Sequence, residues 1–463
     1  MRLIQPAVCI LAFSAVFAAS AQQQEFIKQR EMLHQFAEKG LREALAYDML
    51  KELTRRAPHR LSGSAGADTA VAVTADMLKR IGCDTVWTES CMVPRWERGS
   101  VENVSVIPFK ERRAAFPLSA CALGGSVGTP EDGITGEVIE VQSLDEATAL
   151  REKARGRIIF YNRAMDPGIF STFEAYGGAV DQRSAGARAA AKVGAVAVLV
   201  RSMTSAADDV PHTGTLNYLP DVPKIPGVAL STKASDALSA FLKRDPGARV
   251  RVRLGCRMLP DVPSSNVMGE IRGKENPGEI ILVGGHLDCW DKGMGAHDDG
   301  SGCIHAIEVL RLFRALHIVP KRTIRAVMFM NEENGSRGGE AYGAAPGRQK
   351  ERTIAAVESD RGGFTPRGFT VQSDSATYER VLRWKPLFEE IASGRIIRGG
   401  SGSDVASLVG NGAVGFGLDT DDERYFDVHH SDNDTIDRVH PRELELGAIA
   451  TAFLCYLISE QGL

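Results

Sequence analysis

The sequence predicts an α/β protein in which helices cover a layered sheet and a second α/β domain is inserted into the chain. From Ser265 onward, short apolar runs typical of strands alternate with helical patterns, which indicates a layered sheet. Between residues 115 and 258 the strands are short and the helices alanine-rich, which indicates a separate inserted domain. With 463 residues the chain also exceeds the size of one hydrophobic core.

The composition is that of a soluble globular protein, with 43% hydrophobic and 25% charged residues. A net charge of -4 gives no basic excess to neutralise phosphates, so we expect no nucleic-acid partner. No window beyond the N-terminus approaches the length of a membrane span, so we expect no membrane partner.

The N-terminus predicts a signal peptide, residues 1–21. An apolar run from Ala7 to Ala19 is shorter than the roughly 20 residues of a membrane span and ends in small residues before Gln22. We therefore expect a secreted or periplasmic protein, with an uncleaved membrane anchor as the alternative. The signal removes Cys9 from the eight cysteines, and the odd number that remains leaves at least one unpaired in a monomer.

Residues 22–114 are predicted to form the N-terminal part of the main domain. Apolar residues at helical spacing predict helix between Glu25 and Arg56, and again from Asp68 to Ile81, where Gly82 is a suitable C-cap. A strand is predicted at Thr85–Val93. Within the inserted domain, residues 115–258, four strands are predicted: Gly136–Val141, Arg157–Tyr161, Ala195–Arg201 and Gly227–Leu230. No cluster of titratable residues lies in it, so it either shapes access and contacts partners or is passive.

Residues 259–463 are predicted to form the rest of the main domain. The predicted strands are Asn266–Ile271, Glu279–Val283, Thr323–Met330, Ile354–Val357 and Ala413–Leu418. The predicted helices are Gly302–Leu316, Thr377–Ser393 and Glu443–Ser459.

Side chains that bind metals follow several of these strands. His286 and Asp288 lie two apart, so in an extended chain both leave on one face and Asp288 can accept the second ring N–H of His286. Asp298 and Asp299 lie in a glycine-rich turn before a helix, and this position has two interpretations: a helix N-cap or a carboxylate that bridges two metals. Taken alone, the pair His286 and Asp288 is also compatible with an ordinary surface pair.

Glu332 and Glu333 follow another strand and should point to opposite faces, so that one binds metal and the other moves protons. Asp360 and His430 also come after predicted strands or in a nearby loop, and the carboxyl ends of strands in α/β sheets form the ligand crevice. Together these segments offer enough imidazole and carboxylate for two zinc ions and a general base.

Several further residues have two interpretations. Asp404 is a helix N-cap or a substrate-facing or supporting carboxylate, and Tyr425 is a packed aromatic or a donor to a developing oxyanion. Cys289 and Cys303, which flank the metal motif, are packing residues or thiolate ligands. Asn433-Asp434-Thr435 matches a glycosylation sequon.

These motifs resemble the co-catalytic di-zinc exopeptidases of the aminopeptidase Y and leucyl aminopeptidase type, most of all their plasma glutamate carboxypeptidase branch. The motifs that carry the resemblance occur in the family's order: Gly285-His286-Leu287-Asp288, Gly295-Ala296-His297-Asp298-Asp299-Gly300, Glu332-Glu333, Glu358-Ser359-Asp360, Tyr425-Phe426 and His429-His430-Ser431. Arg60-Leu61-Ser62-Gly63-Ser64 extends it toward the N-terminus. The resemblance implies a mixed-sheet zinc-peptidase sandwich of the phosphorylase/hydrolase-like type with an inserted protease-associated-like domain.

Carried over residue by residue, the resemblance implies two zinc ions as cofactors. His286 and Asp360 would hold one zinc, Glu333 and His430 the other, and Asp298 would bridge them. Glu332 would be the general base and Asp288 would support His286. The resemblance also implies a cis peptide between Asp298 and Asp299, and a homodimer. Cys289 stands where the family commonly has serine, which leaves the ligand set intact.

We therefore expect an exported zinc exopeptidase that hydrolyses dipeptides or short peptides through a metal-bridged hydroxide activated by Glu332. The alternatives are a broader aminopeptidase or a glutamate-type carboxypeptidase, which differ in their substrate pockets. A non-catalytic, receptor-like relative and a glutaminyl-cyclising enzyme are rivals from other classes.

Overall fold

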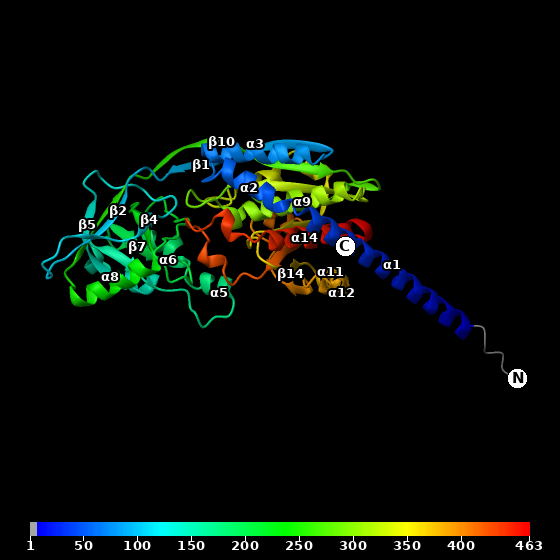
Figure 1. Cartoon of the computed structure of the whole chain (residues 1–463). Coiled ribbons are helices and arrows are strands. Elements are labelled where there is room, and N and C mark those ends of the chain that lie inside the picture. The colour runs from blue at the N-terminus through cyan, green and yellow to red at the C-terminus, as the bar shows by residue number, and fades with distance from the viewer. Residues whose placement is uncertain (1–6) are drawn as a thin grey trace.

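The chain folds around two eight-stranded sheets (Figure 1). The computed structural model describes the backbone from Ala7 to Leu463 and the side chains from Gln23 onward, Gln349 excepted. The predicted signal peptide, residues 1–21, lies outside the part whose side chains are described. Within the described part, no helix is both long and apolar enough to cross a membrane.

The first sheet is mixed and confirms the predicted α/β class. Its strands, in spatial order, are β1 (Thr85–Glu97), β10 (Arg257–Ile271), β12 (Arg322–Phe329), β11 (Asn276–His286), β13 (Arg352–Glu358), β16 (Val414–Thr420), β14 (Pro366–Gln372) and β15 (Arg395–Arg398). The central strands β12, β11, β13 and β16 are parallel, whereas β1, β10 and β14 pair antiparallel with their inner neighbours. Because these four central strands are parallel, their carboxyl ends lie at the same edge of the sheet.

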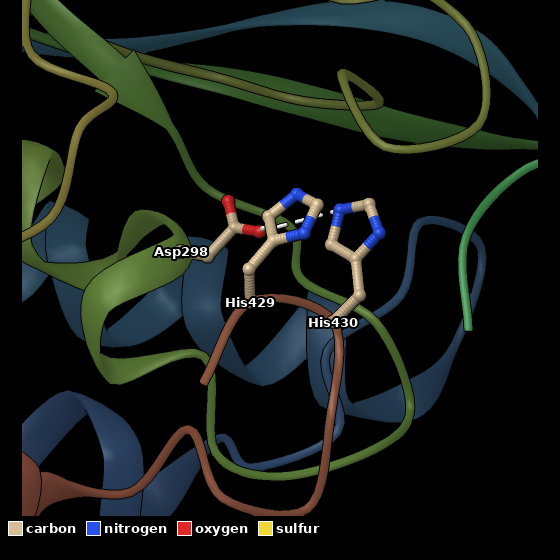
Figure 2. A group of neighbouring side chains, drawn as sticks. All are labelled: Asp298, His429 and His430. Carbon is tan, nitrogen blue, oxygen red and sulfur yellow. Dashed lines mark ion pairs between the residues drawn. The ribbon is translucent and has the colours of Figure 1, made fainter. Parts of the chain in front are cut away.

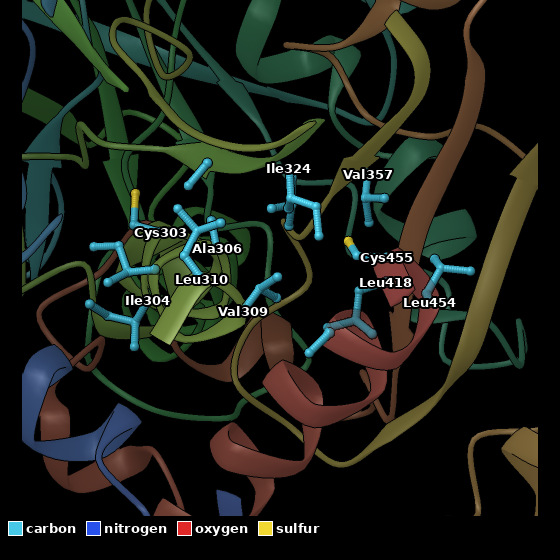
Figure 3. Packing of buried hydrophobic residues seen from close by; sticks show 14 of the residues in the cluster. Cys303, Ile304, Ala306, Val309, Leu310, Ile324, Val357, Leu418, Leu454 and Cys455 are labelled. Atoms are coloured by element: carbon cyan, nitrogen blue, oxygen red, sulfur yellow. The ribbon is translucent and has the colours of Figure 1, made fainter. Parts of the chain in front are cut away.

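Helices cover both faces of this sheet. One face packs against α1 (Ala7–Glu43), α2 (Ala46–Arg56), α3 (Ala65–Arg80), α9 (Ser301–Ala315), α11 (Ser375–Leu382), α12 (Lys385–Glu389) and α14 (Pro441–Gln461). The opposite face carries α10 (Arg337–Ala344) and α13 (Ala406–Gly410). Figure 3 shows the core between α9, α14 and the central strands, where side chains such as Leu310, Ile324 and Leu454 are at most 1% exposed.

The second sheet forms the smaller unit at the opposite end of the molecule from α1 (Figure 1). Its strands, in spatial order, are β3 (Phe116–Pro117), β2 (Glu102–Ile107), β9 (Arg249–Leu254), β5 (Ile134–Val141), β6 (Ile158–Tyr161), β7 (Ala197–Arg201), β8 (Gly227–Leu230) and β4 (Ala120–Ala122). Its helices are α4 (Leu144–Ala149), α5 (Thr172–Gly177), α6 (Asp181–Ser184), α7 (Gly186–Lys192) and α8 (Thr232–Arg244). This second-sheet unit begins at Glu102, before the predicted boundary at residue 115, because β2 pairs with β9 and not with the first sheet.

Most predicted elements of the main domain are present, with three differences. The helix predicted at Thr377–Ser393 is two helices, α11 and α12, because Pro386 lies in the first turn of α12, where proline starts a helix but cannot continue one. The helix predicted across Glu25–Arg56 is broken at Ala44, which has a φ of 47°. Strands β14 and β15 and helices α10 and α13 were not predicted.

Candidate metal centre

The predicted site residues converge at the carboxyl ends of the parallel strands. His286 is the last residue of β11, Glu332 and Glu333 follow β12, and Asp360 follows β13. Asp298 lies in the turn Ala296–Gly300 that precedes α9, where its own backbone is not helical (φ -116°, ψ 94°). His430 comes from the loop after the short 3-10 helix Tyr425–Asp427, far along the chain. The remaining 3-10 turns are Arg151–Ala154, Arg348–Lys350 and Ile436–Arg438.

Asp298 lies between two histidines, each facing a different oxygen of its carboxylate. Its Oδ1 is 3.2 Å from His286 Nε2, and its Oδ2 is 3.3 Å from His430 Nε2. On the first side, Asp360 Oδ1 lies 3.4 Å from His286 Nε2. On the second, Glu333 Oε2 lies 3.0 Å from His430 Nε2. The structure thus places one imidazole and one carboxylate on each side of a shared carboxylate.

This cluster is buried and rich in acid. His286, Asp298 and Glu333 are 1%, 4% and 7% exposed. Burial raises the pKa of Asp360 to about 6 and that of Glu333 well above its usual range, and neighbouring acids such as Asp298 add to both shifts. Burial also lowers the pKa of His430, which keeps its imidazole in the neutral form that binds metals.

The donor set fits a pair of metal ions. Buried carboxylates need a compensating cation, and in the described part of the chain Asp298 Oδ2 and Asp360 Oδ1 have no hydrogen-bond partner. Among the residues with described side chains, three triplets bring their ligand atoms within 4.8 Å of one another: His286, Asp298 and Glu333; His286, Asp299 and Asp360; and Asp298, His429 and His430. Imidazole and carboxylate are ligands that Zn²⁺ accepts.

His429 lies beside His430, and their rings stack with centroids 3.5 Å apart (Figure 2). Its Nε2 is 3.7 Å from Asp298 Oδ2, farther than that of His430. Contact with Glu333 further distinguishes His430, so the geometry favours His430 over His429 as the ligand.

Asp288 supports the centre in a different way from the one predicted. The second ring nitrogen of His286, Nδ1, lies 2.9 Å from the main-chain carbonyl oxygen of Asp288 and not from its carboxylate. The prediction assumed extended backbone through both residues, but β11 ends at His286 and the chain bends at Leu287. The Asp288 carboxylate instead accepts the backbone N–H groups of Asn331 (2.7 Å) and Glu332 (3.1 Å). Asp288 therefore holds the backbone that carries Glu332.

Glu332 lies at the rim of the cluster. Ser403 Oγ donates a hydrogen bond to its Oε1 over 2.8 Å, and no ion pair joins it to either histidine in the described part of the chain. Burial raises the pKa of Glu332, and His286 and Ser403 oppose the shift. A partly accessible carboxylate with a raised pKa has the properties of a general base.

Asp434 is the first of two residues that support the Asp298 turn and were not predicted from the sequence to do so. Asp434 accepts the backbone N–H groups of His297 (2.8 Å) and Asp298 (3.0 Å) with its two oxygens. The peptide between Asp298 and Asp299 is cis, as the resemblance implies. Asp299 accepts the N–H groups of His286 (3.0 Å) and Gly302 (2.8 Å), so it links β11 to the start of α9. Asp434 carried only the signature of a glycosylation sequon.

Arg60 is the second missed residue. It is fully buried, and its guanidinium donates to the carbonyl oxygens of Leu287 (2.6 Å), Met294 (2.6 Å) and Gly295 (2.8 Å). All three carbonyls lie in the segment between His286 and Asp298. Arg60 thus ties the N-terminal segment to the loop that carries His286 and Asp298.

Replacing Arg60 with methionine should lower the free energy of unfolding by about 3 kcal/mol, because three buried carbonyl oxygens lose their donor. Denaturant unfolding of the metal-free protein measures this loss. Arg272→Met is the matched control, since Arg272 is exposed. A loss in Arg60→Met no larger than the ~0.5 kcal/mol typical of surface substitutions would contradict this role.

The remaining candidates resolve as follows. Cys289 and Cys303 are buried with free thiols, and Cys303 Sγ donates to the carbonyl oxygen of His286, which supports packing and not metal ligation. Tyr425 is packed against Phe173 with ring centroids 5.2 Å apart. Asp404 is 2% exposed, and neither of its oxygens has a hydrogen-bond partner in the described part of the chain, so it does not act as an N-cap.

Comparison with known proteins agrees with this arrangement. Residues 266–453 match the model of peptidase family M28. Carboxypeptidase Q from Bos taurus is 33% identical over 90% of this chain and 85% of its own length, and the Homo sapiens protein is 32% identical over the same shares. The crystal structure of a peptidase M28 precursor from Shewanella amazonensis is 31% identical, with a TM-score of 0.87 over 93% of this chain and 96% of that one.

A zinc aminopeptidase from Bacillus subtilis shares the fold, with a TM-score of 0.63 at 20% identity over 88% of this chain and 93% of that one. The buried histidine and carboxylate cluster lies where this α/β zinc-peptidase fold brings its strand ends together. The chain belongs to peptidase family M28 and is a metallo-exopeptidase.

Proposed function

We propose that this protein is an exported, zinc-dependent exopeptidase that hydrolyses dipeptides or short peptides. The observation that carries the proposal is the position of Asp298, whose two carboxylate oxygens face His286 and His430 at 3.2 and 3.3 Å. A carboxylate shared by two ligand pairs is the arrangement that a two-metal hydrolase needs.

We assign His286 and Asp360 to one zinc, His430 and Glu333 to the other, and Asp298 to both. Zinc bound by these residues would polarise the peptide carbonyl and make water more acidic. Glu332 takes a proton from the attacking water and returns it to the leaving amine. Asp288 fixes the backbone of Glu332, and the Ser403 hydroxyl orients its carboxylate.

The end of the peptide that is recognised is part of the proposal. The relatives that match most of this chain carry the name carboxypeptidase Q, which favours substrates with a free carboxyl terminus. Dipeptides satisfy this requirement and also present a free amine. We further propose that the second-sheet unit is a protease-associated-like domain and that the protein is a homodimer.

A panel of one dipeptide in four forms tests the proposal: free, amino-blocked, carboxyl-amidated and blocked at both ends. We expect the zinc-loaded protein to cleave the free dipeptide and to reject the amidated and doubly blocked forms. Cleavage of the amidated form would identify an aminopeptidase. Cleavage of the doubly blocked form would contradict exopeptidase activity, and no cleavage of any form, with fewer than two zinc ions per chain, would favour the non-catalytic relative.

A further inference from the structure

A short stretch of the second-sheet unit contacts the loops of the metal centre. It comprises residues 212–215, His-Thr-Gly-Thr, between β7 and β8, and is called the 212–215 segment below. His212 and Thr213 are 2% and 0% exposed. The segment therefore lies inside the protein, at the junction between the two sheets.

The 212–215 segment makes three hydrogen bonds to main-chain oxygens of site residues. Thr215 Oγ1 donates to the Glu333 carbonyl over 2.6 Å, and the Thr213 N–H donates to the His430 carbonyl over 2.9 Å. His212 Nδ1 lies 2.6 Å from the His429 carbonyl. Because a carbonyl oxygen only accepts, Nδ1 carries the proton. Burial lowers the pKa of His212 to about 4, so the ring is neutral.

One of the residues that receive these bonds needs external support. His430 has a φ of 60°. Non-glycine residues seldom adopt this left-handed region, and the surrounding structure has to hold them there. Hydrogen bonds to the carbonyls of Glu333 and His430 fix the orientation of both peptides.

The 212–215 segment is itself fixed within the second-sheet unit. The His212 N–H donates to Ser202 Oγ over 2.8 Å, and Thr213 Oγ1 donates to the Ala122 carbonyl over 2.9 Å. The Gly124 N–H donates to the Gly214 carbonyl over 3.0 Å. The segment that supports Glu333 and His430 is therefore anchored by hydrogen bonds to its own unit.

The other ligand pair is held differently. His286 is oriented by Asp288 and Asp299, which belong to the first-sheet unit. Among the described residues, no hydrogen bond joins the 212–215 segment to His286 or Asp360. The three contacts thus act on one side of Asp298 and not on the other.

We propose that Thr215 and His212 are positioning residues for the metal held by Glu333 and His430, and that the 212–215 segment sets the affinity of this site and not that of the site at His286 and Asp360. This inference rests on the proposed function, because it takes Glu333 and His430 as ligands of one zinc. It gives the second-sheet unit a specific task at the centre, beyond shaping access to it.

The test measures zinc content directly. Wild-type holoenzyme and Thr215→Val are equilibrated with a graded series of zinc buffers, and the zinc remaining on each chain is determined. Valine keeps the shape of threonine but removes the donor to Glu333. We expect wild type to hold two zinc ions, and Thr215→Val to lose one of them at about 10- to 100-fold higher free zinc while the other is released as in wild type.

Two further variants make the result specific. Thr215→Ser keeps the hydroxyl and should restore the wild-type release curve. Thr148→Val removes an exposed threonine hydroxyl from α4 of the same unit and should have no effect. If Thr215→Val fails to fold, His212→Phe, which removes the donor to His429, must show the selective loss instead.

The outcomes separate the two proposals. Wild type that binds fewer than two zinc ions would refute the proposed function. The role of the 212–215 segment would be refuted if wild type binds two zinc ions and the Thr215→Val or His212→Phe variant releases both ions as wild type does. It would also be refuted if the variant binds both ions with equally reduced affinity. Either result would leave the proposed function standing.

Discussion

The Glu332→Gln variant should bind two zinc ions and lose nearly all hydrolysis, with kcat lower by roughly 10²- to 10⁴-fold. Glutamine has nearly the same shape and can still accept the hydrogen bond from Ser403, but it cannot take a proton from water. Because Glu332 lies outside the two ligand pairs, the metal content should not change. Steady-state kinetics on a free dipeptide, with zinc analysis of the same sample, measures both quantities.

Glu340→Gln is the matched control, since Glu340 is exposed on α10 and the same charge is removed nearby. This control should keep wild-type kcat. Unchanged hydrolysis in Glu332→Gln would show that another group moves the proton. Loss of zinc from Glu332→Gln would show instead that this carboxylate is a ligand.

The Asp298→Asn variant is expected to hold at most one zinc ion per chain and to lose about 10³-fold or more in kcat/KM. An amide brings no negative charge to share between two cations, and metal-ion catalysis contributes several kcal/mol, with each 1.4 kcal/mol equal to a factor of ten. Elemental analysis after dialysis and kinetics in zinc-buffered solution report the two effects.

Asp221→Asn, a change at an exposed aspartate of the second-sheet unit, serves as the control for Asp298→Asn and should retain both metals. Two zinc ions bound to Asp298→Asn with unaltered affinity would exclude a bridging carboxylate. In that case each histidine and carboxylate pair would bind its metal independently.

The sequence predicted the strands that position the site because those strands are buried on both faces and appear as continuous apolar runs. β11, β12 and β13 end at or near His286, Glu332 and Asp360, so the prediction that parallel strand ends meet was enough to bring these residues together. Strands β14 and β15 were missed for the opposite reason. β14 begins with Pro366 and contains Gly368, two residue types depleted in strands.

The supporting contacts could not be predicted because they depend on backbone direction in loops. The exit of the chain from β11 decides whether the Asp288 carboxylate meets His286 or Asn331, and no pattern in the sequence fixes that bend. Arg60 and Asp434 act on main-chain groups far away in the chain. One missed element did carry a signal, since β9 alternates arginine with apolar residues throughout.

Asp434 lies 136 residues after Asp298 in the chain, yet it holds the turn of Asp298, and the nearby His430 faces it. Contacts this distant in sequence form late, after most of the polypeptide is available. A nascent chain therefore has no complete metal centre before the segment that carries His430 and Asp434 has been synthesised.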